Sequence, residues 1–87
     1  MKSQVTEDFM ACFARLPETI RDRGRKSYRL WRSKPVHPGL HFKRIHKKEA
    51  MYSVRISNDY RAIGLLADDT MAWIWIGTHA EYDEVIK

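Results

Sequence analysis

The sequence is poor in cysteine, with Cys12 as its only one. One cysteine cannot form an intrachain disulfide, and no Cys/His set has the spacing of a zinc site. Three histidines, His37, His41 and His46, match no metal-binding spacing and have no acidic cluster beside them. We therefore expect Cys12 to be a buried thiol in a reducing cytoplasm, with neither a metal nor a cofactor.

Long apolar runs are absent as well. No run approaches the ~20 residues that span a bilayer, and Met1–Gln4 leads into no apolar segment of a signal peptide. The sequence therefore predicts a cytoplasmic protein that makes no use of a membrane. A chain of 87 residues is a single domain, residues 1–87. A domain of this size has little room for a deep pocket, so a shallow surface site is expected.

Acidic residues are scarce in the middle of the chain. Lys and Arg number 16 against 11 Asp and Glu, a formal net charge of +5. Between Arg15 and Arg61 the only acidic residues are Glu18, Asp22, Glu49 and Asp59. This distribution favours a polyanionic partner, either nucleic acid or an acidic protein. Charge alone fits a merely solvated basic surface equally well.

Apolar residues at helical spacing predict two helices with a short connection. Thr6 suits the N-cap of the first helix, and Pro17 both ends it and opens the second. Lys34-Pro35 ends the second helix. Such a pair should form an antiparallel hairpin. The first helix has one apolar face, made of Val5, Phe9, Cys12, Phe13 and Leu16, and the second has a stripe of Ile20, Gly24, Ser27 and Trp31.

The rest of the chain predicts antiparallel strands over residues 40–45, 51–57, 60–67 and 70–77. Tight turns lie at Asn58-Asp59 and Asp68-Asp69, and residues 79–87 suit one or two helical turns. The predicted fold class is α+β, with the helix hairpin packed on one face of a small antiparallel β-sheet.

Two-residue turns fix an expected register for this sheet. Arg61 then pairs near Ile56 and Ile76, at the end of the sheet where Gly77-Thr78-His79 leaves it. The face under the helices would carry Val54, Ile56, Ile63, Leu65, Ile74 and Ile76. The opposite face would carry Ser53, Arg55, Ala62, Gly64, Trp73 and Trp75, although a bulge would move side chains between the faces.

Three segments resemble one known family. Residues 52–63, YSVRISNDYRAI, resemble the "Y-x-[VI]-R-[VI]-x-x-x-Y-R" strand pair of RelE/ParE-type toxins. Residues 75–79, WIGTH, resemble the last strand ending in "G-[ST]-H" of YafQ-like members, and residues 40–45 resemble the preceding strand. The resemblance implies a microbial ribonuclease-like fold and the toxin component of a type II toxin–antitoxin system. Some such toxins cut mRNA in the ribosomal A site as mRNA interferases, whereas ParE-type members inhibit DNA gyrase without nuclease activity.

The resemblance also suggests site residues for a metal-free endoribonuclease. RNA cleavage by the 2′-hydroxyl needs a base, cations around the phosphorane and an acid. Arg61 matches the "Y-R" arginine and would hold the scissile phosphate. Otherwise it is a strand-end cation, or an ion-pair partner of Glu81 or Asp83. His79 would transfer a proton, although it replaces the arginine of RelE, and otherwise it packs at a strand end.

The remaining candidates are weaker. Tyr82 would stack on a base or donate a proton, or else it packs in the core. Lys43, Arg44 and Arg55 would bind RNA phosphates, or else they are solvated strand charges. Trp73 and Trp75 suit a core better than a base-stacking surface. The expected partners are mRNA on the ribosome, or gyrase in the alternative, and an acidic, partly disordered antitoxin that folds over the basic surface.

Overall fold

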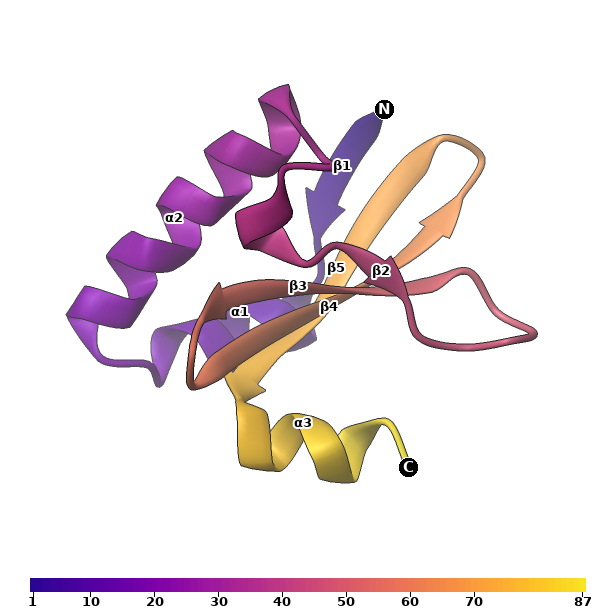
Figure 1. Ribbon diagram of the computed structural model, residues 1–87. Coiled ribbons are helices and arrows are strands. Elements are labelled where there is room, and N and C mark those ends of the chain that lie inside the picture. Colours follow the sequence, from indigo (N-terminus) through magenta and orange to yellow (C-terminus); the bar gives the residue numbers. More distant parts are fainter.

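A computed structural model describes all residues, 1–87, as two helices on one face of a five-stranded sheet (Figure 1). The strands are β1 (Lys2–Val5), β2 (Lys43–Arg44), β3 (Met51–Ser57), β4 (Tyr60–Ala67) and β5 (Thr70–Thr78). The helices are α1 (Glu7–Ala14), α2 (Glu18–Ser33) and α3 (His79–Val85), with a 3-10 turn, η1 (Pro38–Leu40). The strand order is β1-β5-β4-β3-β2, so the α+β prediction is confirmed.

The start of α1 and both ends of α2 lie where the sequence predicts. Helix α1 ends earlier than predicted, at Ala14, so Leu16 lies beyond the helix on whose face it was expected. The Thr6 hydroxyl accepts a hydrogen bond from the Phe9 N–H at 3.2 Å, which caps α1. Pro17 lies at the N-cap of α2, and that helix stops at Ser33, with Lys34 as its C-cap before Pro35. Val5 was wrongly expected on the helical face, because it belongs to β1 and stays 50% exposed.

The strand β1 was not predicted from the sequence. It runs parallel to β5, from the Lys2–Thr70 pair to the Val5–Trp73 pair. The segment Lys2–Val5 shows no apolar alternation, so it carries no local strand signal. Tertiary contacts hold it instead, since Arg32 donates to the Ser3 hydroxyl at 3.2 Å, and Ser3 also contacts the Tyr28 hydroxyl. The sheet is therefore mixed rather than purely antiparallel.

The strand predicted over residues 40–45 is shorter in the structure. Only Lys43 and Arg44 pair with β3. Leu40 is the last residue of η1 and is 2% exposed, so it is a core residue that lies in a turn rather than in a strand. His41 follows with φ 46°, a left-handed conformation that interrupts any extended run.

Two bulges change the register of the central strands. The first lies between Arg55 and Ser57, so Arg61 pairs with Arg55 rather than Ile56. The second lies between Ile63 and Gly64, whose partners on β5 are Trp75 and Trp73. Because neighbouring residues of a strand point to opposite faces, the second bulge places these two tryptophans on opposite faces.

The predicted face assignment was therefore wrong in part. Each bulge adds one residue and reverses the face alternation of the residues after it. Ile63 and Leu65 lie on the face away from the helices, whereas Ala62, Gly64 and Trp73 lie beneath them. The helix-covered face carries Val54, Ile56, Ala62, Trp73 and Ile76. The opposite face, called here the distal face, carries Ser53, Arg55, Arg61, Ile63 and Trp75.

The core beneath the helices centres on Trp31 of α2, which is 2% exposed. Its ring meets Trp73 edge-on at 5.1 Å between centroids, and Phe42 at 6.1 Å. Cys12 is only partly buried, although we expected a buried thiol. No helix is both long and apolar enough to cross a bilayer.

Candidate functional site

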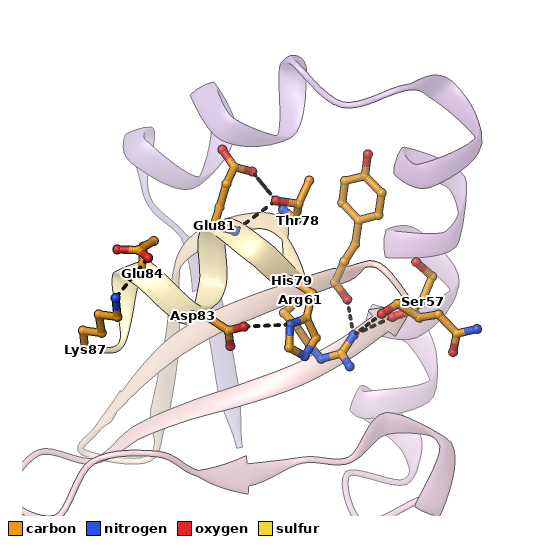
Figure 2. Close-up of polar contacts among 10 residues, drawn as sticks. Ser57, Arg61, Thr78, His79, Glu81, Asp83, Glu84 and Lys87 are labelled. Atoms are coloured by element: carbon orange, nitrogen blue, oxygen red, sulfur yellow. Dashed lines mark hydrogen bonds and ion pairs between the residues drawn. The ribbon is translucent and has the colours of Figure 1, made fainter.

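Arg61 and His79 lie at the same end of the sheet. Tyr60 pairs with Thr78 and Arg61 pairs with Gly77, where β4 begins and β5 ends. The His79 N–H donates to the Asp59 carbonyl at 2.6 Å, which ties the start of α3 to the β3–β4 turn. Figure 2 shows the two side chains at this corner. Arg61 therefore lies at the end of the sheet that the sequence predicts for it.

The β3–β4 turn holds the Arg61 guanidinium. One of its nitrogens, Nη1, donates to the Ser57 carbonyl at 2.6 Å, to that of Tyr60 at 2.9 Å and to that of Asn58 at 3.4 Å (Figure 2). No carboxylate pairs with Arg61, so the ion pair that the sequence left open is not formed. The donors on Nε and Nη2 remain for an outside ligand.

A second guanidinium stands directly across the hairpin. Arg55 pairs with Arg61 in the register, and both side chains leave the distal face half-buried. The Arg55 side chain donates to the Asn58 carboxamide oxygen in the same turn. Like charges directly opposite each other are destabilising in a sheet, so an anion between them would relieve that cost. Asn58 was not predicted as part of the site, since in the sequence it indicates only a turn.

A capping box sets the start of α3. The Thr78 hydroxyl accepts from the Glu81 N–H at 3.1 Å, and the Glu81 carboxylate accepts from the Thr78 N–H at 3.0 Å. Hydrogen bonds from the Thr78 backbone and then its hydroxyl lower the pKa of Glu81 below the ordinary 4.5, with Arg15 adding to the effect and slight burial opposing it. His79, the first residue of α3, is thereby fixed beside the turn.

The His79 ring has two neighbours on its own helix. Its Nδ1 lies 3.3 Å from Asp83 Oδ2 (Figure 2). Its ring also meets that of Tyr82 edge-on, at 5.8 Å between centroids. The His79 side chain is 46% exposed, so a large substrate can reach it. Asp83 was not predicted as a neighbour of His79. The signal was there, because residues four apart share a helix face.

Tyr82 is buried, with 6% exposure. Its ring lies 6.4 Å from that of Trp75 on the distal face, so α3 packs there through this tyrosine. The observed contacts are those of the packing alternative. A reagent role for Tyr82 stays a prediction, and so does base stacking by the partly exposed Trp75. Trp73 is 5% exposed beneath the helices, out of reach of a base.

Lys43 and Arg44 occupy different environments. Lys43 pairs with Ser53 and so belongs to the distal face with Arg55. The Arg44 guanidinium instead donates to the carbonyls of His46 and Glu49, at 3.0 and 3.2 Å. RNA binding by these residues stays a prediction, and the geometry favours Lys43.

His37 and His46 accept hydrogen bonds from backbone N–H groups of their own loops. His37 Nδ1 accepts from the Gly39 N–H at 3.0 Å, and His46 Nδ1 accepts from the N–H groups of Lys48 and Glu49. These are turn-stabilising bonds from side chain to backbone. No group of three or more His, Cys, Asp or Glu side chains is arranged to hold a metal.

Helix α2 carries a row of arginines, Arg21, Arg25, Arg29 and Arg32, and most of them contact other residues of the fold. Arg21 donates to the Leu16 carbonyl at 2.8 Å, and Arg32 reaches Ser3 of β1. Arg25 pairs with Asp22 at 2.8 Å and lies over the Phe13 ring at 5.3 Å. The contacts of these three arginines lie within the fold, so much of this row cannot be counted as free RNA-binding charge.

An apolar cleft of about 530 Å³ opens between α1 and α2 above the sheet. Val5, Met10 and Tyr28 line it while being 50%, 59% and 41% exposed. Arg25 and Arg29 also line it. Figure 1 shows both helices on the same side of the sheet, so this cleft lies on the face opposite Arg55 and Arg61. It was not predicted from the sequence, because helical periodicity does not reveal a gap between helices.

This fold and cationic corner define a small toxin of the RelE/ParE type. The family model of the ParE-like toxin domain matches residues 18–84, which include both Arg61 and His79. The chain therefore belongs to the ParE-like toxin domain family, and the resemblance seen in the sequence is confirmed.

Solved structures agree on the fold at low sequence identity. The RelB-RelE antitoxin-toxin complex of Methanococcus jannaschii matches with a TM-score of 0.75 at 15% identity, over 95% of this chain and 98% of that chain. YafQ of Escherichia coli matches with a TM-score of 0.73 at 12% identity, over 93% of this chain and 96% of that chain. A YoeB/ParE toxin from Agrobacterium tumefaciens matches with a TM-score of 0.71 at 15% identity, over 91% of this chain and 99% of that chain. No curated protein matches the sequence.

Proposed function

We propose that this toxin is a metal-free endoribonuclease that cuts mRNA on the ribosome. The observation that supports the proposal is the meeting of Arg55, Arg61 and His79 at one corner of the sheet. Two guanidinium groups suit a phosphate, because each donates in a planar fork. A histidine beside them supplies proton transfer near neutral pH, which a purely binding protein does not need.

The reaction balances without a metal or cofactor. The 2′-hydroxyl oxygen forms a bond to the adjacent phosphorus as His79 Nε2 takes its proton. The bond from phosphorus to the 5′-oxygen breaks, and that oxygen takes a proton from a water molecule. The proton held by the His79 imidazolium then passes to the hydroxide that remains, which restores both the water and the neutral imidazole. The products are a 2′,3′-cyclic phosphate and a 5′-hydroxyl. Arg55 and Arg61 would stabilise the phosphorane charge that develops in between.

The exposed, shallow corner supports a large substrate rather than a small one. His79 is 46% exposed, and the distal face around it offers no deep pocket that would enclose a nucleotide. Positioning of the RNA therefore has to come from elsewhere, which the ribosome would provide. Lys43 on the same face would add a contact to the RNA backbone.

The test is cleavage in a cell-free translation extract with mapping of mRNA 5′ ends. We expect His79→Ala to slow cleavage by about 10²–10⁴-fold and Arg61→Ala by about 10²–10³-fold. The matched controls are His41→Asn, which tolerates the left-handed backbone, and Arg23→Ala on the exposed side of α2. Both controls should cut normally. Intact mRNA with folded wild-type protein would reject the nuclease.

The alternative function is inhibition of DNA gyrase without hydrolysis, as the ParE branch suggests. It predicts loss of supercoiling activity when purified protein is added to gyrase and plasmid. It also predicts that His79→Ala inhibits gyrase as well as wild type, since no proton is transferred. The presence of His79 beside two arginines favours the nuclease over this alternative.

The partner is proposed to be an acidic antitoxin whose amphipathic helix occupies the apolar cleft. The cleft exposes Val5, Met10 and Tyr28, and Arg29 at the same cleft suits an acidic side chain. Met10→Glu should abolish co-purification with the antitoxin encoded beside the toxin. The matched control is Val36→Glu, since Val36 is 87% exposed outside the cleft. Equal binding by both variants would place the antitoxin elsewhere.

A further inference from the structure

The carboxylate of Asp83 faces the catalytic histidine candidate from one turn further along α3. Its Oδ2 lies 3.3 Å from His79 Nδ1, and the two residues are four apart on the helix. The Asp83 side chain is 58% exposed, and this ion pair is its polar contact within the fold. The Asp83 carboxylate therefore does not stabilise the core, and its contact within the fold is with His79.

The two ring nitrogens of His79 then differ. A neutral imidazole carries one proton, and the hydrogen bond at one nitrogen decides which nitrogen keeps it. A carboxylate can accept a hydrogen bond but cannot donate one. The Asp83 carboxylate lies 3.3 Å from Nδ1, so its negative charge favours the tautomer that has its proton on Nδ1 and a free lone pair on Nε2.

Other parts of the corner support this orientation. The backbone N–H of His79 is bound to the Asp59 carbonyl, and the Tyr82 ring packs edge-on against the imidazole. Asp83 is the charged side chain that contacts the ring, and Asp59 in the β3–β4 turn meets His79 through its backbone carbonyl. Arg61 carries only donors, so it cannot accept a proton from the ring, and the Asp83 carboxylate at 3.3 Å is the group that favours a proton on Nδ1.

We infer that Asp83 is a positioning residue that fixes His79 in the Nδ1-protonated tautomer and so presents Nε2 as the base toward RNA. The inference rests on the proposed function, in which His79 takes the 2′-hydroxyl proton. Asp83 itself touches no reacting atom. Its effect is on how often the ring is ready to accept a proton, and on the direction of its lone pair.

Three variants separate this role from helix packing. Asp83→Ala removes the acceptor, whereas Asp83→Asn keeps an oxygen at the same distance along the side chain. The matched control is Glu84→Ala, which removes a carboxylate one residue away that pairs with Lys87 at 3.1 Å. Both positions are exposed, so the folded state should survive each change.

The first measurement is the ¹⁵N spectrum of the imidazole at a pH where the ring is neutral. This readout needs no ribosome and no activity. We expect the Nδ1-protonated form in wild type, Asp83→Asn and Glu84→Ala. Asp83→Ala should shift toward the Nε2-protonated form, which is the ordinary majority for a free imidazole. An Nε2-protonated wild type, or no change in Asp83→Ala, would overturn the inference.

The second measurement is the cleavage rate on translating ribosomes. We expect Asp83→Ala to lower the rate at saturating substrate by about 10-fold with no change in KM, less than the 10²–10⁴-fold cost of losing a general base. Asp83→Asn should recover most of the rate. A tautomer shift without any rate change would reject the positioning role. If wild type cuts no mRNA at all, the proposed function fails while the tautomer result still stands.

Discussion

Gly77 lies under the Trp75 ring at the point where β5 leads into the candidate site. A Cβ at this position would lie 2.5 Å from Trp75 Cζ2, 2.9 Å from Cη2 and 3.0 Å from Glu81 Oε1. Carbon atoms pack best at about 3.5–4.0 Å, so the indole would have to move by about 1 Å. Trp75 cannot move freely, because it packs against the buried Tyr82. Gly77→Ala therefore overpacks the distal face.

We expect Gly77→Ala to lower the free energy of unfolding by about 1–3 kcal/mol, the usual cost of one extra methyl in a packed site. Urea unfolding followed by tryptophan fluorescence measures it. For a domain of this size, each kcal/mol lowers Tm by about 4–8 °C. Because Glu81 is also crowded, the capping box and His79 should shift, and mRNA cleavage should fall more than stability alone explains.

The same substitution at Gly24 is the matched control. A Cβ there meets Phe13 at 3.4 Å and Ile76 at 3.9 Å, which are ordinary contacts. Gly24 lies inside α2, where alanine is preferred to glycine by about 0.5–1 kcal/mol. Gly24→Ala should therefore be neutral or stabilising. If Gly77→Ala also left stability unchanged, the steric reasoning about the Trp75 ring would be refuted.

Three further predictions concern the ends of the elements. Thr78→Ala removes the N-cap of α3 and should cost about 1 kcal/mol in urea unfolding; an unchanged midpoint would contradict the capping role. The pKa of Glu81 is lowered in the folded state, so its charge adds stability above pH 4.5 that is lost as the pH falls through the folded value. Wild type should thus exceed Glu81→Gln in stability at about pH 7 and lose that advantage as the pH falls below the folded-state pKa of Glu81. Arg44→Ala frees three loop carbonyls and should speed amide hydrogen exchange in residues 46–49 without changing the Tm by more than a few degrees.

Local signals were enough to place most of the elements. Each of these signals depends only on residues close in sequence. They are the caps at Thr6 and Pro17, the end of α2 before Pro35 and the two tight turns, and each lies where the sequence predicted. The meeting of Arg61 with the residues around Gly77 was also predictable, since it depends only on hairpin lengths.

The predictions that failed concern contacts between distant residues. Neither bulge is marked by a turn residue in the sequence, and the one between Ile63 and Gly64 places Trp73 and Trp75 on opposite faces. The parallel strand β1 has no apolar pattern of its own and exists only because β5 offers an edge. Within the site, the positions of Arg61 and His79 were predictable, and the i,i+4 spacing of His79 and Asp83 also stands in the sequence although the pair was not predicted.

The parallel pairing of β1 with β5 has a consequence for the order of folding. Lys2 and Ser3 find their partners only at Thr70 and Met71, near the other end of the domain. Such long-range pairings close large loops, and they slow folding. Until residues Thr70–Trp73 have been synthesised, β1 has no strand to pair with. The corner that holds His79 is built at the far end of that same β5 strand. A growing chain therefore completes its sheet and its candidate site together, after most of the chain has been synthesised.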